Sequence, residues 1–366
     1  MTRFASSKRS MRFNCIYRRD MDYGSIGKPR VTSADVAALA GVSQSTVSYV
    51  MTGKRTISDD TRERVLAAMK KLGFQPNAGA RALAGRRSNV IGLLIRLDTT
   101  TDMEGTLPFI DTITRVAREF DYDVVLVTGE DGAAEMERLA GRSVVDAMIL
   151  MDIRDVDPRL DAASDLGVPV VLIGVPRGTP QFDAFDFDVT AAAELAVEEL
   201  VRDGADHITL VGEPPAVSSE GYGFIRGFEE SAQRAADTAR LPLHIIRPPA
   251  PGVAGFHAVA DQLLSEPGRA GIIARAPQVV SWTLHHLSSL GVTPGPDVGL
   301  VGLCTDEAAT AFTEAVTNVS PEPRAVSRAA VERLVQRLAG IEPAHTPRAT
   351  LLPPRLTRRA TTRGHE

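Results

Sequence analysis

Residues 31–85 read VTSADVAALAGVSQSTVSYVMTGKRTISDDTRERVLAAMKKLGFQPNAGARALAG, and this stretch decides how the chain is organised. Apolar residues recur there at helical spacing in three short runs, which predict helices over 33–40, 44–51 and 59–72. Gly41 ends the first run, and Ser43 is placed to cap the second. Two short helices joined by a glycine turn indicate a helix-turn-helix, whose second helix lies in the major groove of DNA.

The third predicted helix has one apolar face and one basic face. Apolar residues that would cover the first two helices recur at helical spacing: Val65, Leu66, Met69 and Leu72. Basic residues occupy the other face: Arg62, Arg64, Lys70 and Lys71. Such a face can be an ordinary solvated surface, but beside a helix-turn-helix it favours contact with DNA phosphates.

Three segments carry a family resemblance: DVAALAGVSQSTVS, ISDDTRERVLAAMKKLGFQPN and ARALAGRRSNVIGLLI. They resemble, in order and spacing, the DNA-binding headpiece of the lactose/galactose repressor (LacI/GalR) family. The resemblance implies that four residues read bases: Gln44, Ser45, Ser48 and Tyr49. It implies that four others contact the DNA backbone: Thr46, Lys54, Asn77 and Arg81. Leu83 matches the leucine that the family's hinge helix inserts into the minor groove.

Tyr49 is the one departure in the predicted recognition helix, because many family members have arginine there. An arginine can make a bidentate contact to guanine, whereas tyrosine offers one hydroxyl and an apolar ring. We therefore expect a different operator base opposite Tyr49, or a phosphate contact through its hydroxyl.

The rest of the chain alternates strand-like apolar runs with helical patterns, which predicts doubly wound parallel α/β layers. The resemblance continues here to a two-lobed, type I periplasmic-binding-protein-like body. It implies a first lobe at about 89–188 and 320–342, and a second lobe at about 189–319 and 346–360. The expected domains are a disordered basic extension (1–29), a helix-turn-helix domain (30–75), a hinge helix and linker (76–88), and an effector-binding and dimerisation domain (89–366).

Charge is divided unevenly along the 366 residues. Residues 1–88 contain 17 Lys and Arg against 6 Asp and Glu, whereas the remainder contains 24 against 40. A basic head on an acidic body fits a chain with one end that binds nucleic acid. The basic stretch 1–29 is interpreted as a disordered extension or as an early start, with Met11 or Met21 as the true first residue; the alternative is a DNA-grasping arm.

No export or membrane signal is present in the sequence. No run approaches the ~18 consecutive apolar residues of a membrane span. The first twenty residues are basic but lack the apolar core of a signal peptide. We therefore expect a cytoplasmic, nucleoid-associated protein that makes no membrane contact.

The predicted second lobe departs from the family's sugar-binding members at three polar positions. Phe224 stands where those members usually have an arginine, and Arg275 stands where they tend to have asparagine. Thr305 stands where they have an aspartate, with Asp306 one place later. We expect these four residues to contact the effector. Together with Arg226 they can form a different polar site, for a larger or anionic ligand; alternatively, the response to an effector has been lost.

Two other groups of residues could indicate cofactor binding or catalysis. Gly221, Gly223 and Gly227 lie about ten residues beyond their strand, too far for a dinucleotide-binding turn. Asp186 and Asp188 share one face of an extended run; they can form a carboxylate pair, but the family resemblance favours a cleft edge. We therefore expect no enzyme activity, no cofactor and no metal site.

The sequence thus predicts a sequence-specific transcriptional regulator, typically a repressor, that binds a palindromic operator in double-stranded DNA as a homodimer. A small molecule in the inter-lobe cleft, expected to be a sugar or sugar derivative, would set its DNA affinity. A solute-binding protein is the alternative, since it would share the body; such a protein would need an export signal and no headpiece.

Overall fold

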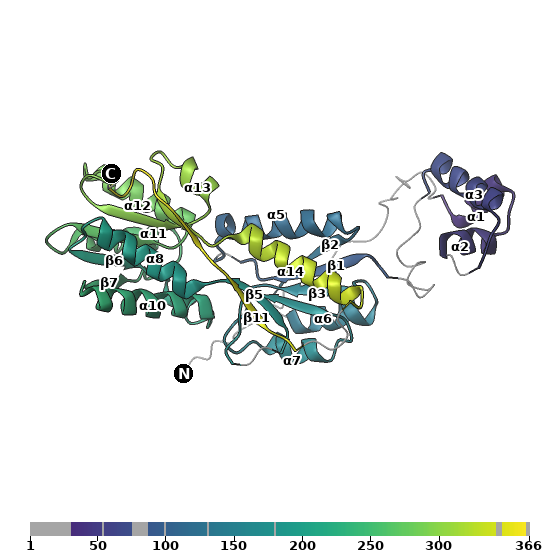
Figure 1. Cartoon of the computed structure of the whole chain (residues 1–366), viewed down its shortest axis with the longest axis horizontal. Helices are drawn as coiled ribbons and strands as arrows, with labels where there is room; N and C mark the ends of the chain where they lie inside the picture. Colours follow the sequence, from purple (N-terminus) through teal and green to yellow (C-terminus); the bar gives the residue numbers. More distant parts are fainter. Residues whose placement is uncertain are drawn as a thin grey trace, which may run out of the picture. The chain divides into compact units, whose positions relative to one another are not determined.

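The computed structural model describes residues 31–52, 55–74, 87–98, 100–129, 132–178, 181–341 and 346–363. The chain divides into two compact units, one ending at Ala84 and the other beginning at Gly85. The first unit is a helical headpiece and the second is an α/β body, as Figure 1 shows. Within the ranges described, no helix is both long and apolar enough to cross a membrane.

In its described part, the headpiece has three helices: α1 (Ser33–Ala40), α2 (Gln44–Thr52) and α3 (Asp59–Leu72). Thr32 and Asp35 form a capping box at the start of α1. Gly41 ends α1 with φ +66°, a left-handed conformation that glycine adopts without steric cost. The Ser43 hydroxyl then accepts a hydrogen bond from the Thr46 N–H at 3.1 Å, which caps α2. Local signals therefore specify the predicted helix-turn-helix.

A small apolar core joins the three headpiece helices. Val36, Val47 and Val65 are fully buried, one from each helix. The prediction for α3 was wrong at one position, because Leu66 is 48% exposed and Ala68 is buried instead. The helices approach closely, so the short alanine side chain fits at this inward position.

The first lobe of the body is a six-stranded parallel sheet, in the order β11-β5-β4-β3-β1-β2. Its strands are β1 (Val90–Ile95), β2 (Asp123–Thr128), β3 (Ala147–Leu150), β4 (Val170–Ile173), β5 (Asp183–Phe187) and β11 (Ala349–Leu352). Helices α5 (Met103–Glu119) and α14 (Pro323–Leu338) cover one face. Helices α6 (Gly132–Gly141) and α7 (Pro158–Ser164) cover the other.

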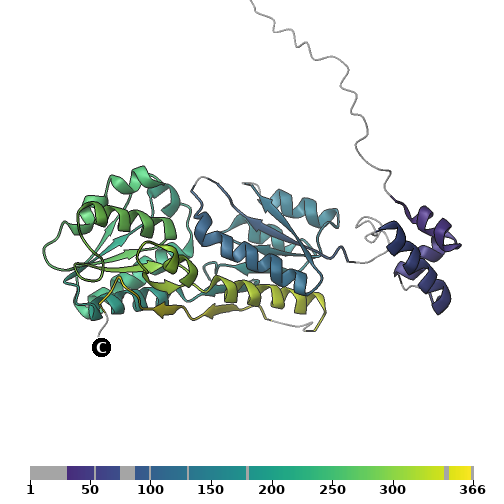
Figure 2. The same ribbon diagram turned by 90° about the horizontal axis from the view of Figure 1, so that it is seen from above.

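The second lobe repeats this plan with the strand order β12-β10-β9-β8-β6-β7 and an antiparallel β12. Figure 2 shows this lobe, mostly green, beside the mostly blue first lobe. Its strands are β6 (His207–Val211), β7 (Leu243–Ile246), β8 (Ala270–Ala274), β9 (Gly299–Leu303), β10 (Thr317–Ser320) and β12 (Arg355–Thr357). Helices α8 (Val189–Arg202) and α10 (Gly223–Ala239) cover one face, and the short α9 (Pro215–Ser218) precedes α10. The other face carries α11 (Val253–His257), the 3-10 helix Ala260–Leu264, α12 (Pro277–Ser289) and α13 (Asp306–Ala311).

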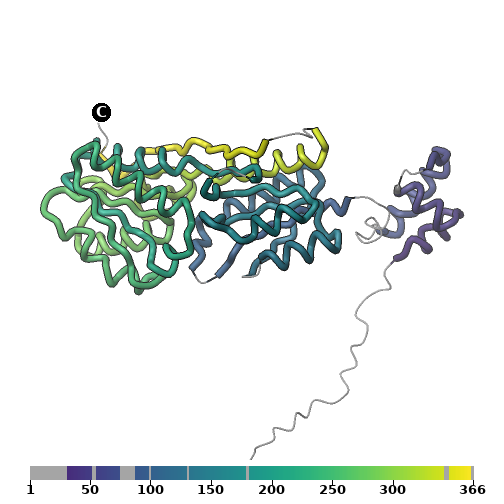
Figure 3. The backbone as a smooth tube through the Cα atoms, turned by 90° about the horizontal axis from the view of Figure 1, so that it is seen from below, coloured from purple at the N-terminus to yellow at the C-terminus, as the bar shows by residue number. Residues whose placement is uncertain are grey.

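The chain passes between the lobes after β5, after β10, and between β11 and β12. Figure 3 shows the C-terminal segment lying along both lobes. This arrangement corrects the prediction that 346–360 belongs to the second lobe, because β11 pairs with β5 and only β12 pairs with β10. Pro353 and Pro354 separate the two strands. Proline has no N–H for a sheet ladder, so one continuous strand cannot form there.

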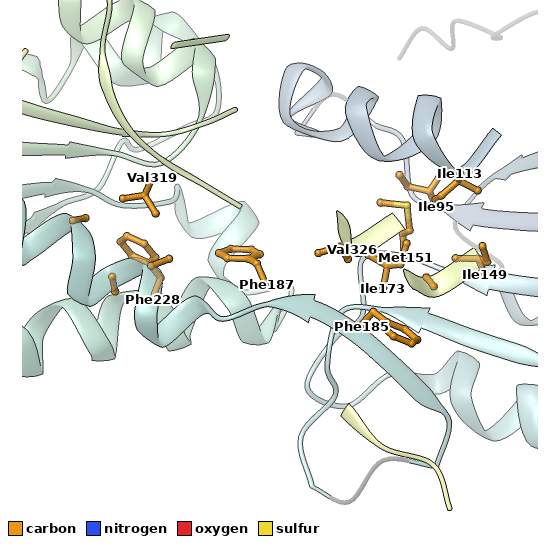
Figure 4. Packing of buried hydrophobic residues seen from close by; sticks show 14 of the residues in the cluster. Ile95, Ile113, Ile149, Met151, Ile173, Phe185, Phe187, Phe228, Val319 and Val326 are labelled. Atoms are coloured by element: carbon orange, nitrogen blue, oxygen red, sulfur yellow. The ribbon is translucent and has the colours of Figure 1, made fainter. Parts of the chain in front are cut away.

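Apolar side chains from both lobes meet beside these crossings. Phe187 at the end of β5, Phe228 in α10 and Val319 in β10 belong to one buried cluster. In Figure 4, Phe187 lies between Phe228 of the second lobe and Val326 of the first. Apolar packing therefore joins the two lobes where the chain crosses between them.

Candidate functional site

Helix α2 presents a polar face. Gln44, Ser45 and Ser48 are exposed, as expected for residues that read bases, and Tyr49 is half-buried. Gln44 Nε2 donates a hydrogen bond to Ser33 Oγ at 2.8 Å, which ties the start of α2 to α1. Small hydroxyl and amide groups on a helix of this kind can donate to and accept from base edges.

The residues expected to contact the DNA backbone are only partly described. Thr46 is half-buried, and its hydroxyl shares a hydrogen bond with Ser43 Oγ at 2.8 Å. Lys54, Asn77, Arg81 and the wedge residue Leu83 lie outside the described residues. On α3, Arg62, Lys70 and Lys71 are exposed. Arg64 forms an ion pair within the headpiece, since its Nε lies 3.3 Å from a carboxylate oxygen of Asp60.

A cleft of about 300 Å³ lies between the two lobes of the body. Its walls come from the segments that follow the carboxyl ends of the strands, where α/β sheets usually bind ligands. Arg96 follows β1, Asp152 lies just beyond β3, Glu213 just beyond β6, and Arg275 follows β8. Of these four, the sequence reasoning named only Arg275, although position after a buried strand was the available signal for all of them.

Aromatic rings line much of the second-lobe wall. Tyr222 and Phe224 stack with ring centroids 5.8 Å apart, and Phe256 and Trp282 are also 5.8 Å apart. Phe224, predicted to contact the effector, remains 39% exposed. Flat aromatic faces beside polar groups suit ligands with both apolar and hydroxyl-bearing surfaces.

Three half-buried aspartates line the cleft. Burial raises the pKa of Asp186 to about 7, although the Phe187 N–H hydrogen bond opposes this. Burial also raises the pKa of Asp152 and of Asp102. For Asp102, the neighbouring carboxylates of Glu104 and Glu213 add to the increase. Asp188, which the sequence offered only as an alternative partner of Asp186, caps α8 by accepting from the Ala191 N–H at 3.0 Å.

Arg275, which was expected from the sequence to contact the effector, lines the cleft. Its side chain is only 3% exposed, and burial lowers the pKa of the guanidinium against the opposing effect of Glu213 and Glu229. Neither Nε nor Nη1 has a hydrogen-bond partner among the described residues. The guanidinium carbon lies 5.0 Å from the centre of the Phe228 ring. Arg275 therefore offers donors that a ligand can satisfy.

Asp306 and Arg226 do not line the cleft, contrary to the interpretation of the sequence. The Asp306 carboxylate lies 2.5 Å from Arg355 and 2.8 Å from Arg359, both in the C-terminal segment. Burial raises the pKa of Asp306, but hydrogen bonds led by that from Arg359 outweigh it and lower the pKa overall. Thr305 does line the cleft, and its hydroxyl caps α13.

Ionic contacts join the two lobes at the rim of the cleft. Glu220 of the second lobe lies 2.6 Å from Arg96 and 2.5 Å from Arg154, both in the first lobe. Arg226 lies 2.7 Å from Asp155. The Asp155 N–H also donates to the Gly221 carbonyl at 2.8 Å. Separation of the lobes at this rim would break these contacts, and we refer to the Glu220, Arg96 and Arg154 group as the rim latch.

Comparisons with known proteins match both units. Residues 32–77 match the model of bacterial regulatory proteins of the lacI family, and residues 197–362 match the periplasmic binding protein-like domain. The HTH-type transcriptional regulator MalR of Streptococcus pneumoniae is 34% identical over 192 residues, or 50% of this chain. Residues 32–77 therefore form a lacI-type regulatory domain, and the body contains a periplasmic binding protein-like domain. The match spans 57% of the MalR sequence, little more than half its length.

Longer matches cover most of the chain. The HTH-type transcriptional regulator CelR of Thermobifida fusca is 29% identical over 85% of this chain and 93% of its own sequence. A structure of a CelR–cellobiose complex superimposes with a TM-score of 0.63 and 25% identity, covering 91% of this chain and 100% of the other. A lac repressor dimer bound to operator and the anti-inducer ONPF has the same fold, with a TM-score of 0.74, 24% identity, and coverage of 91% and 99%.

Proposed function

We propose that this chain is a transcriptional regulator, in most settings a repressor, that binds operator DNA with its headpiece and a small molecule in its inter-lobe cleft. The exposed polar face of α2 within a lacI-type headpiece is the observation that carries this proposal. Phosphate attraction from the basic face of α3 supports it, because such contacts supply much of the affinity of proteins for DNA. We propose that it acts in the cytoplasm, associated with the nucleoid.

Operator recognition is tested by substitution on α2. The half-site is first selected from random duplexes, and affinity is then measured by fluorescence anisotropy at fixed salt. Gln44→Ala should weaken specific binding by about 1–3 kcal/mol and leave binding to unrelated DNA unchanged, because base contacts carry the specificity. Gln262→Ala, at an exposed position on the body, is the matched control. Equal loss on specific and unrelated DNA would assign Gln44 to the backbone instead.

We propose that the chain works as a homodimer on a palindromic site, as two-fold symmetry requires. The edge strand β2 supports this proposal because its Val125 and Leu126 are 37% and 43% exposed. Exposed apolar edges usually require a cover, and a second copy supplies one. Analytical ultracentrifugation of Leu126→Glu should detect a shift toward monomer, whereas an unchanged dimer would place the contact elsewhere.

We propose that the effector is carbohydrate-related. Aromatic rings, buried carboxylates and the unpaired donors of Arg275 together suit a ligand with apolar faces and many hydroxyl groups. The related CelR was solved in complex with cellobiose. We expect an oligosaccharide or a derivative to bind better than free glucose, galactose or ribose, since three family anchors are replaced here.

A thermal-shift series on the whole chain tests the effector proposal. Arg275→Ala should remove the response to the best-binding saccharide, and Arg138→Ala on α6 should not, because Arg138 lies outside the cleft. A large shift with a simple monosaccharide that survives Arg275→Ala would mean that the binding site lies elsewhere.

A further inference from the structure

The charges that line the cleft are strongly unbalanced. Among the residues that the structure describes, two guanidinium groups face six carboxyl groups there, of which Asp186 is partly protonated at neutral pH because its pKa is about 7. Arg96 is already neutralised, since its Nε lies 2.8 Å from Asp98 and its Nη1 lies 2.6 Å from Glu220. Arg275 therefore remains as the cation against the other carboxyl groups: Asp102, Glu104, Asp152, Asp186 and Glu213.

Arg275 has its own opposing charges. Glu229 lies 3.8 Å from Arg275 Nη1, but both oxygens of Glu229 accept hydrogen bonds from Arg247, at 2.6 and 2.9 Å. Glu213, which lines the cleft, also interacts favourably with Arg275. The field around Arg275 is therefore close to neutral, although its Nε and Nη1 still need acceptors. A hydroxyl or ring oxygen of an uncharged ligand supplies such an acceptor.

Two of the carboxylates face the cleft from opposite lobes. Asp102 caps α5 in the first lobe by accepting from the Gly105 N–H at 3.1 Å. Glu213 follows β6 in the second lobe, close enough for its charge to raise the pKa of Asp102. Like charges on opposing walls resist closure of the lobes. Hydroxyl donors or a cationic group between the walls would relieve this repulsion, whereas an anionic group would increase it.

Arg275 considered by itself suggests an anionic ligand, but the whole charge set favours the opposite sign. Resting on the proposed function of the cleft, we infer that its effector is a polyhydroxylated ligand without negative charge. We infer further that an amino sugar is preferred over the neutral sugar and that sugar acids are rejected. Arg275 holds ligand oxygens, while Asp102 and Glu213 accept from hydroxyl and ammonium groups across the cleft.

A set of disaccharides that share a linkage but differ in charge tests this inference on the whole chain. The probes are cellobiose, the β-1,4-linked dimer of glucosamine, and cellobiuronic acid, together with the corresponding α-1,4-linked set. Isothermal titration calorimetry at neutral pH should order the affinities as amino, then neutral, then acidic, with at least about tenfold between the two ends. That factor corresponds to about 1.4 kcal/mol.

Two variants test whether Glu213 and Asp102 cause this order of affinities. Glu213→Gln removes one wall charge and should reduce the ratio of amino to acidic affinity by about tenfold, as one unit charge near a protein surface can. Asp102→Asn should act in the same direction. Glu194→Gln, an equal charge change at an exposed site on α8 outside the cleft, should leave the ratio unchanged.

The inference is overturned if the acidic disaccharide binds best and loses its affinity in Arg275→Gln, if Glu213→Gln and Glu194→Gln behave alike, or if every probe fails to bind. Binding of selected operator DNA by the same sample keeps these results separate from the regulator proposal. Retained operator binding leaves that proposal standing when the charge preference fails, whereas loss of all specific DNA binding contradicts the regulator itself.

Discussion

Glu220→Gln should loosen the closed state of the body, because it removes the charge at the centre of the rim latch. Glu220, Arg96 and Arg154 keep 27%, 28% and 34% of their side-chain surface exposed. Buried charge-assisted hydrogen bonds contribute about 1.5–3 kcal/mol each, and fully exposed ion pairs contribute about 0.2–1 kcal/mol. Water still screens these groups, so we take about 0.5–1 kcal/mol for each pair, and about 1–2 kcal/mol for the latch as a whole.

Hydrogen exchange measures this opening without any ligand. The Asp155 N–H is bonded to the Gly221 carbonyl of the other lobe, so it exchanges when the lobes separate. A loss of 1–2 kcal/mol should speed its exchange about 5–30-fold. The Met151 N–H, bonded within the first lobe to Leu94, should keep its wild-type rate.

Glu119→Gln is the matched control for the latch. Glu119 accepts from Arg328 at 2.9 and 3.0 Å, and this pair joins α5 to α14 inside the first lobe. Glu119→Gln removes one carboxylate charge, as Glu220→Gln does, but from an ion pair that does not span the cleft. Unchanged exchange at Asp155 in Glu220→Gln, or equal acceleration in Glu119→Gln, would refute the latch.

Three further predictions concern the headpiece, the hinge and the cleft. Tyr49→Arg should change the preferred base at one position of each half-site by about 1–3 kcal/mol, and selection from random DNA checks this. Leu83→Ala should remove several of the about 4–10 kcal/mol that separate specific from unrelated DNA, with thermal stability unchanged, in a titration at fixed salt. For Asp186, the folded pKa of about 7 lies above the ordinary value of 3.8. The stability contributed by its protonated form is therefore complete below pH 3.8 and is lost as the pH rises through 7. Asp186→Asn should therefore raise the melting temperature most above pH 7, by the equivalent of up to about 4 kcal/mol, because the shift is about three pKa units at about 1.4 kcal/mol each; scanning calorimetry across pH would detect this.

Elements built from local signals were predictable from the sequence. The headpiece helices follow from side-chain caps, a glycine turn and apolar spacing, all set by residues within a few positions of each other. Strands β1 and β6 were also predictable, because parallel strands covered on both faces have continuous apolar sequences. Strand β5 (DAFDF) and strand β10 (TNVS) lack such sequences, so their residues alone do not indicate buried strands. Their place in the sheets depends on pairing with neighbours far away in the sequence.

The cleft divides in the same way between sequence and tertiary structure. Arg275 could be singled out through the family resemblance, as the residue that replaces a usual asparagine, yet nothing near it in the sequence indicates what it faces. Asp102 and Glu213 come from different lobes and are more than a hundred positions apart, so their opposition arises only when the sheets are placed. Asp306 was expected to contact the effector because of its position after a strand. In the structure its carboxylate forms ion pairs with Arg355 and Arg359 of the C-terminal segment instead. Periodicity and caps act over one or two turns of chain, whereas the charge of a cleft is a sum over residues that only the fold brings together.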